Sequence, residues 1–166
     1  MMPSAQYWID TLQLTRHPEG GSYIRTYHSP VTIPAQQLPA PFKGPRLAST
    51  AIYFLLEKGQ FSAMHRIASD ELWHFYYGSP LAVYEIDNEG KLTEHLLGNN
   101  PENGESFQCV VKAGSWFGAK MKGDNYSLVG CTVAPGFDFA DFELAARDIL
   151  LQLYPQHAAI IKALTH

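Results

Sequence analysis

A histidine and a glutamate six positions apart are the residues of this chain best suited to chemistry. They are His65 and Glu71, and they lie between Gly59 and Gly78. Alternate residues of a strand share one face, so His65 and Ile67 face the same way on one strand and Glu71 starts the same face of the next. If both faces point inward, these three side chains meet inside the protein. A histidine and a carboxylate beside apolar neighbours have shifted pKa values, which suits acid–base chemistry.

The elements that must position this pair are short strands. Runs rich in aromatic and β-branched residues alternate with turn signals, and Asp87 to Gly90 is a strong hairpin signal. About nine strands are predicted by these rules: Tyr23–Tyr27, Ser49–Leu56, Phe61–Ile67, Glu71–Tyr77, Leu81–Ile86, Leu92–Leu97, Phe107–Val111, Ser115–Ala119 and Tyr126–Val133. Their regular spacing is typical of a sandwich or barrel.

Both ends of the chain show helical patterns. The segment Ser4 to Leu12 predicts a short helix capped by Ser4. Apolar residues at helical spacing from Phe142 to Leu153 predict a second helix that starts near Asp138 or Ala140 and ends at Pro155, with a further short helix behind it. The proline-rich stretch over residues 30–45 predicts a long loop, which could cover the mouth of a pocket or a neighbouring subunit.

The composition indicates one folded domain over residues 1–166. Hydrophobic residues make up 46% of the 166 positions and charged residues 17%, with a formal net charge of -4. Scattered Lys and Arg residues argue against a nucleic acid or membrane partner. Cys109 and Cys131 lack a close C-x-x-C spacing, which argues against a disulfide framework or a thiolate zinc site. No signal peptide or spanning segment is recognised, so we expect a cytoplasmic protein whose partners are a small-molecule ligand and, as a homodimer, its own copy.

The spacing around His65 resembles the first motif of the cupin superfamily, which is a glycine, five residues, His-x-His, three or four residues, a glutamate, six residues and a glycine. Ile67 stands where the motif has its second histidine. Lys112 to Phe117 resembles the second motif, Pro-x-Gly-x-x-His, with Phe117 in place of the histidine. The resemblance implies an all-β fold, a cupin jelly-roll β-barrel (double-stranded β-helix) with short N- and C-terminal helices.

The same resemblance bears on metal binding. In cupins that hold a metal, both histidines and the glutamate of the first motif, with the histidine of the second, are the ligands. Ile67 and Phe117 replace two of these four and cannot coordinate a metal. We therefore expect no metal and no other cofactor, and a degenerate metal oxygenase is the weakest functional hypothesis.

More of the chain resembles an uncharacterised branch of cupins that is often labelled predicted sugar epimerases. The motifs span nearly the whole chain: His17-Pro-Glu-Gly-Gly-x-Tyr23, Ser69-Asp-Glu-x-Trp-His74, Trp116-Phe-Gly-Ala119 and Val133-Ala-Pro-Gly-Phe-Asp-Phe139. That label rests on a distant likeness to dTDP-4-dehydrorhamnose 3,5-epimerases. These enzymes use a barrel histidine paired with an aspartate, and a tyrosine, without metal.

Two functions of different classes follow, and the sequence does not decide between them. One is a metal-independent epimerase or isomerase that acts on a sugar or nucleotide-sugar-like metabolite, with His65 as base and Glu71 beside it. The other is a non-catalytic cupin that binds a small polar ligand. The residues expected to contact the ligand are Trp73, Phe75, Phe117, Ile67 and Glu19.

Two partners of His65 stay open at this stage. Asp138 or Asp141 could orient the imidazole, although either is equally placed to cap the C-terminal helix. The acid could be a strand tyrosine, for which the candidates are Tyr53, Tyr84 and Tyr126.

Overall fold

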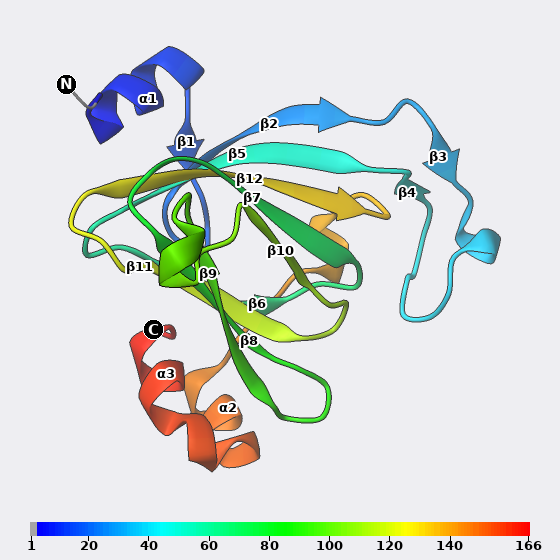
Figure 1. Cartoon of the computed structure of the whole chain (residues 1–166). Helices are drawn as coiled ribbons and strands as arrows, with labels where there is room; N and C mark the ends of the chain where they lie inside the picture. Colours follow the sequence, from blue (N-terminus) through cyan, green and yellow to red (C-terminus); the bar gives the residue numbers. More distant parts are fainter. Residues whose placement is uncertain (1–2) are drawn as a thin grey trace.

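The computed structural model describes residues 3–166 and consists of two antiparallel β-sheets that face each other, with helices at both ends of the chain (Figure 1). The larger sheet has six strands, in the order β1 (Thr15–Arg16), β2 (Ser22–His28), β5 (Thr50–Glu57), β12 (Tyr126–Ala134), β7 (Asp70–Gly78) and β10 (Gln108–Val111). The smaller sheet has five, in the order β13 (Glu143–Leu144), β6 (Phe61–Arg66), β11 (Trp116–Met121), β8 (Leu81–Ile86) and β9 (Leu92–Leu97). This is the predicted jelly roll, although the two sheets do not close into a barrel.

The predicted strands are all present, with bounds that differ by a residue or two. The strands β8 and β9 have the predicted bounds, and the Asp87 side chain accepts hydrogen bonds from the backbone of Glu89 and Lys91 in the hairpin between them. Alternation places one face of each sheet in a shared core, where Phe54, Trp73 and Phe117 are almost fully buried.

The N-terminal helix is α1 (Ala5–Leu12), and Ser4 caps it by accepting a hydrogen bond from the Tyr7 amide, as predicted. It lies on the outer face of the larger sheet. There Trp8 Nε1 donates a 2.7 Å hydrogen bond to the Tyr126 hydroxyl. The helices α2 (Arg147–Leu153) and α3 (Ala158–Ala163) pack instead against the outer face of the smaller sheet, through Leu150 and Ile161 among others. Short 3-10 turns complete the set: Ala35–Gln37, Pro101–Asn103, Phe139–Asp141 and Pro155–His157.

The predicted start of the C-terminal helix is wrong. Residues 139–141 form a 3-10 turn, and β13 (Glu143–Leu144) pairs with the edge of β6 before α2 begins at Arg147. The apolar spacing from Phe142 onward predicts a helical face, but Phe142 packs beside His65 from an extended segment. The unpaired edge of β6 gains backbone hydrogen bonds from β13, and this tertiary contact overrides the local pattern.

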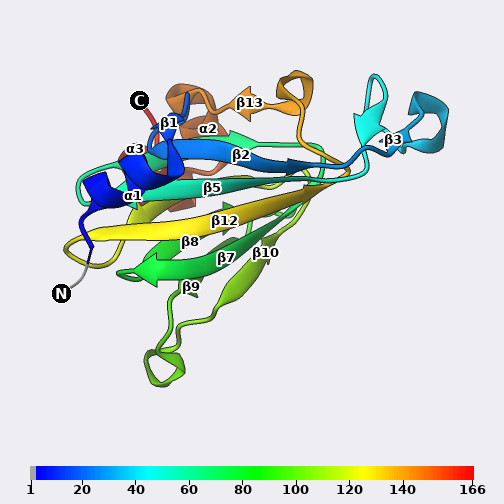
Figure 2. The ribbon, with the colours of Figure 1, turned by 90° about the horizontal axis from the view of Figure 1, so that it is seen from above.

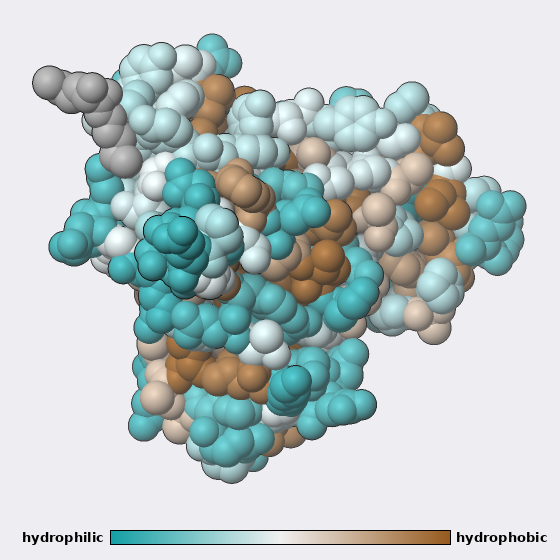
Figure 3. All heavy atoms as spheres, in the orientation of Figure 1, coloured by the Kyte–Doolittle hydropathy of each residue, from teal (hydrophilic) through white to brown (hydrophobic). Residues whose placement is uncertain are grey.

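The proline-rich stretch forms an arm that extends away from the two sheets (Figures 1 and 2). It is built from β3 (Thr32–Ile33), which pairs with β4 (Arg46–Leu47), and from the segment between them. Figure 3 shows hydrophobic residues on its surface. Arg46 ties its base to the body, because the guanidinium makes hydrogen bonds of 2.7 and 2.6 Å to the Asp141 carboxylate. Within residues 3–166, no helix is long and apolar enough to span a membrane.

Candidate functional site

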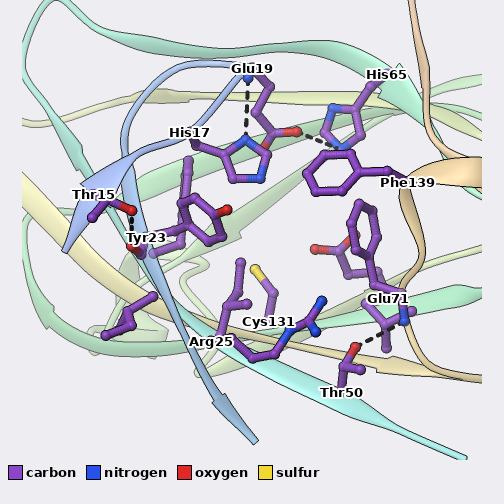
Figure 4. A pocket seen from close by; sticks show the side chains of 15 residues that line it. Thr15, His17, Glu19, Tyr23, Arg25, Thr50, His65, Glu71, Cys131 and Phe139 are labelled. Atoms are coloured by element: carbon purple, nitrogen blue, oxygen red, sulfur yellow. Dashed lines mark hydrogen bonds and ion pairs between the residues drawn. The ribbon is translucent and has the colours of Figure 1, made fainter. Parts of the chain in front are cut away.

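A cavity of about 330 Å³ opens on the inner face of the larger sheet (Figure 4). Three of the residues singled out from the sequence line it, namely His65, Glu71 and Glu19. The others that line it are Thr15, His17, Tyr23, Ile24, Arg25, Thr50, Ile52, Phe54, Cys131, Val133, Phe137 and Phe139. The volume is near the lower end of the range for small-molecule sites, roughly 300–1,000 Å³.

His65 is held at one end of this cavity by both of its ring nitrogens. Nδ1 lies 2.8 Å from the carbonyl oxygen of Ala63, and Nε2 lies 3.0 Å from Glu19 Oε2. The ring packs against Phe117 and Phe142, at centroid distances of 4.1 and 5.2 Å, and the residue is 3% exposed. Burial alone would lower the pKa of His65, but the facing Glu19 carboxylate outweighs burial and the pKa is raised. Two acceptors on two nitrogens favour the imidazolium form.

Glu19 reaches His65 from the turn between β1 and β2. Ser62 Oγ donates a 2.9 Å hydrogen bond to Glu19 Oε1, and the amide of Ala63 donates a 2.7 Å bond to the Glu19 carbonyl. Burial would raise the pKa of Glu19, but the charge and hydrogen bond of His65 lower it overall. Gly20 allows the turn to lie this close to β6. Its φ is +109°, and a Cβ there would come within 2.1 Å of the Phe61 carbonyl oxygen.

His17 lies on the same turn and is uncharged. Its Nδ1 accepts a 3.2 Å hydrogen bond from the Glu19 amide, so the ring proton is on Nε2. Burial lowers the pKa of His17, the Glu19 carboxylate opposes this, and His65 adds to it. The His17 ring lies edge-on to the rings of Tyr23 and Phe54, with centroid distances of 4.5 and 6.0 Å.

Glu71 carries a carboxyl whose pKa is strongly raised. It comes from β7, is 7% exposed, and accepts a hydrogen bond from the thiol of Cys131 on β12. Burial raises the pKa of Glu71 to about 7, while His65 opposes the rise and Glu19 adds to it. A carboxyl with this pKa is present in both protonation states at neutral pH, which is what a group that gives and takes protons requires.

The aromatic residues expected to line the cavity lie elsewhere. Trp73, Phe75, Phe117 and Ile67 face inward as expected, but they are packed between the two sheets in the core and none of them lines this cavity. Their inward faces are covered by one another, since Trp73 contacts Phe117 edge-on at a centroid distance of 6.4 Å. The aromatic wall of the cavity is instead formed by Tyr23, Phe54, Phe137 and Phe139.

The candidate partners of His65 are also placed elsewhere. Asp138 caps the 3-10 turn at Ala140, and Asp141 binds Arg46. None of the three strand tyrosines lines the cavity. Tyr53 packs on Tyr76 on the outer face of the larger sheet, Tyr126 bonds to α1, and Tyr84 lies beside Lys120 and Lys122.

Among the lining residues that the sequence did not identify as ligand contacts are His17, Tyr23 and Arg25. The first two belong to the family motif from His17 to Tyr23, and Tyr23 also starts a predicted strand, but neither of these patterns assigns a residue to the ligand. The alternation of β2 places Tyr23 and Arg25 on the same face. That pattern was the available signal, but it does not reveal that this face borders a cavity.

The donor set does not suit the metal that many cupins hold. Ile67 and Phe117 are buried apolar residues, and both nitrogens of His65 already have protein partners. Over residues 3–166, no group of three or more His, Cys, Asp or Glu side chains is arranged to hold a metal ion.

Known proteins resemble this chain along its whole length. Protein YML079W of Saccharomyces cerevisiae is 31% identical over 170 residues, which span 94% of this chain and 83% of the yeast protein. The crystal structure of protein SO0799 from Shewanella oneidensis is 41% identical, with a TM-score of 0.88. A hypothetical protein from Leishmania major is 35% identical, with a TM-score of 0.89. In both structural matches 99% of each chain is covered.

The family comparison agrees with the fold. The model of the cupin superfamily (DUF985) matches residues 6–145, and the chain belongs to this family.

Proposed function

We propose that this cupin binds a small polar metabolite of the sugar class in the cavity and transfers protons on it, as a metal-independent isomerase of the epimerase type. The observation that carries the proposal is the convergence of two buried groups on one cavity. One is the Glu71 carboxyl, and the other is the His65–Glu19 ion pair. Aromatic side chains around them suit the faces of a sugar ring.

In this proposal Glu71 takes the proton. Its carboxylate removes a proton from the carbon beside a substrate carbonyl, and the electron pair of that C–H bond moves to the carbonyl oxygen as an enolate. The His65 imidazolium lies at the same end of the cavity. Both of its N–H groups are taken by Ala63 and Glu19, so it stabilises the enolate oxygen through its positive charge and not through a hydrogen bond. The sequence pattern favours His65 as the base. The bonds to Ala63 and Glu19 favour giving it to Glu71 instead.

Tyr23 is the group best placed to return a proton on the opposite face. It comes from β2, and β5 and β12 separate that strand from β7, which carries Glu71. At about 4.8 Å per strand, the two backbones are roughly 14 Å apart, which leaves room for a sugar ring between the side chains. Figure 4 shows Tyr23 and Glu71 on opposite sides of the cavity. Proton return from Tyr23 would invert the carbon as the enolate electron pair re-forms the C–H bond. Water would then take the proton from Glu71 and return one to the Tyr23 phenolate.

The second candidate is a ligand-binding cupin without catalysis. The observation that favours it is the complete engagement of His65, because a histidine with partners on both nitrogens is also what a purely structural ion pair looks like.

Deuterium incorporation separates the two candidates. The purified protein is incubated in deuterated water with a panel of keto-sugars and keto-sugar nucleotides, and deuterium at the carbon beside the carbonyl is measured by mass spectrometry. We expect exchange on at least one of them, above the rate without protein. If none exchanges, and one binds equally well to wild type and to Glu71→Gln, the isomerase proposal fails and the binding function takes its place.

A further inference from the structure

Arg25 is the one strongly basic side chain that lines the cavity, and it has no partner there. It comes from β2 opposite Ile52, next to a register shift that separates it from Tyr27. Irregularities of this kind re-aim side chains beside functional sites. Figure 4 shows Arg25 among the side chains that point into the cavity. Among residues 3–166, its guanidinium makes no hydrogen bond or ion pair.

The neighbouring Arg46 shows what a structural arginine looks like in this protein. A shallow hollow at the cavity mouth is lined by both arginines, together with Phe137 and Phe139. Arg46 is buried and held by Asp141 through two hydrogen bonds, so its charge is compensated. Arg25 is exposed and keeps all of its donors available.

The charges inside the cavity leave Arg25 uncompensated. Glu19 and His65 form an ion pair and offset each other. Burial keeps His17 neutral by lowering its pKa, and it keeps Glu71 protonated in much of the population at neutral pH by raising its pKa. A ligand that completes this set of charges therefore carries a negative charge at the end nearest the mouth.

From this geometry we propose that Arg25 anchors the anionic group, a carboxylate or a phosphate, of a small metabolite whose other end faces Glu71 and His65. A guanidinium binds either group through two parallel hydrogen bonds. The cavity of about 330 Å³ suits a sugar acid or sugar phosphate better than a nucleotide-linked sugar. The exposed Phe139 and the partly buried Phe137 supply an apolar rim between the anchor and the floor. This inference rests on the proposed function and names the substrate class.

The test measures binding by calorimetry at pH 7, with probes matched in size. Glucuronate carries a carboxylate, glucose 6-phosphate carries a phosphate, and glucose is the neutral match. We expect at least one anionic probe to bind wild type with a dissociation constant of about 1 mM or below, and glucose to bind roughly tenfold more weakly or worse. Whichever anionic probe binds identifies the charged group.

The variant Arg25→Gln should weaken binding of that probe by about 10- to 100-fold, the scale of a lost charge-assisted hydrogen bond. Arg16→Gln is the matched control, because it removes the same charge as Arg25→Gln. Arg16 is an exposed arginine on the adjacent strand and does not line the cavity. It should bind the probe as wild type does. Any of three results overturns the proposal. They are glucose that binds wild type as tightly as the anionic probe, an anionic probe that binds Arg25→Gln as tightly as wild type, and the absence of binding of either anion.

The result is distinguishable from failure of the isomerase proposal. If an anion binds through Arg25 but no substrate exchanges deuterium, the anchor stands and the catalysis fails. If a keto-sugar that carries a carboxylate or phosphate exchanges deuterium equally well in wild type and Arg25→Gln at subsaturating substrate, the catalysis stands and the anchor fails.

Discussion

The Glu71→Gln variant is expected to exchange deuterium into its substrate about 10²- to 10⁴-fold more slowly than wild type, because the amide cannot take the proton that the carboxylate removes. Glutamine has nearly the same shape, so the cavity should remain intact. The measurement is the initial rate of deuterium incorporation at the carbon beside the carbonyl, at saturating substrate. The pH dependence of the exchange rate provides a second test of the base role. Since the base acts when deprotonated, the wild-type rate should rise as the pH increases through about 7.

Glu85→Gln is the matched control for this experiment. Glu85 is also buried and pairs with His95, with 2.8 Å between Glu85 Oε2 and His95 Nε2, but it lies on β8 and does not line the cavity. It should exchange at nearly the wild-type rate. A Glu71→Gln variant that exchanges as fast as wild type would remove Glu71 from the base role. A loss confined to His65→Ala would return that role to His65.

The stability of the protein should depend on pH through the same carboxyl. An unfolded glutamate has a pKa near 4.5, whereas burial raises the pKa of Glu71 to about 7 in the folded state. The folded state therefore holds this proton more tightly. Its contribution to stability is fully present below pH 4.5 and is lost as the pH rises through about 7.

The expected effect is large, because Glu71 is 7% exposed and solvent does not screen it. The free energy of unfolding of wild type, measured relative to Glu71→Gln, should fall by about 3 kcal/mol between pH 4.5 and pH 8. Urea denaturation of both proteins across this range gives the difference, in which the contributions of titrating groups that do not interact with Glu71 cancel. A difference that stays constant with pH would show that Glu71 has an ordinary pKa.

The strands could be predicted from the sequence because their signals are local. Alternating apolar residues and turn residues such as those from Asp87 to Gly90 act within a few positions, and β8 and β9 have the predicted bounds. The start of α2 could not be predicted in the same way. The segment that contains Phe142 has helical spacing but is drawn into an extended path by its contact with His65 and by the pairing of β13 with β6.

The inward direction of His65 and Glu71 was also predictable, since it follows from strand alternation. Which carboxylate would face His65 could not be predicted. Asp138 and Asp141 were the candidates for orienting it, but Glu19 occupies that position from a turn far earlier in the chain. Only the close packing of Gly20 on β6 brings this turn to the histidine, and such a long-range contact leaves no periodic pattern in one sequence.

The alternation of inward and outward side chains along the strands does not by itself identify the residues that face a ligand. Trp73 and Phe117 point inward, yet they fill the space between the sheets, whereas Tyr23 and Arg25 on β2 face the open part of the cavity. Which stretch of an inner face is filled and which is open depends on how the two sheets are offset. That offset is a property of the assembled fold.

The most direct test of this account is the titration of the Glu71 carboxyl itself. Protein labelled with carbon-13 at its glutamate carboxyl groups is titrated by NMR from pH 4 to pH 9, and comparison with Glu71→Gln assigns the resonance. We predict a midpoint near pH 7 for Glu71, the value expected for a buried carboxyl that exchanges protons at neutral pH. A midpoint at or below the ordinary value of 4.5 would contradict the account, because Glu71 would then be a permanent carboxylate.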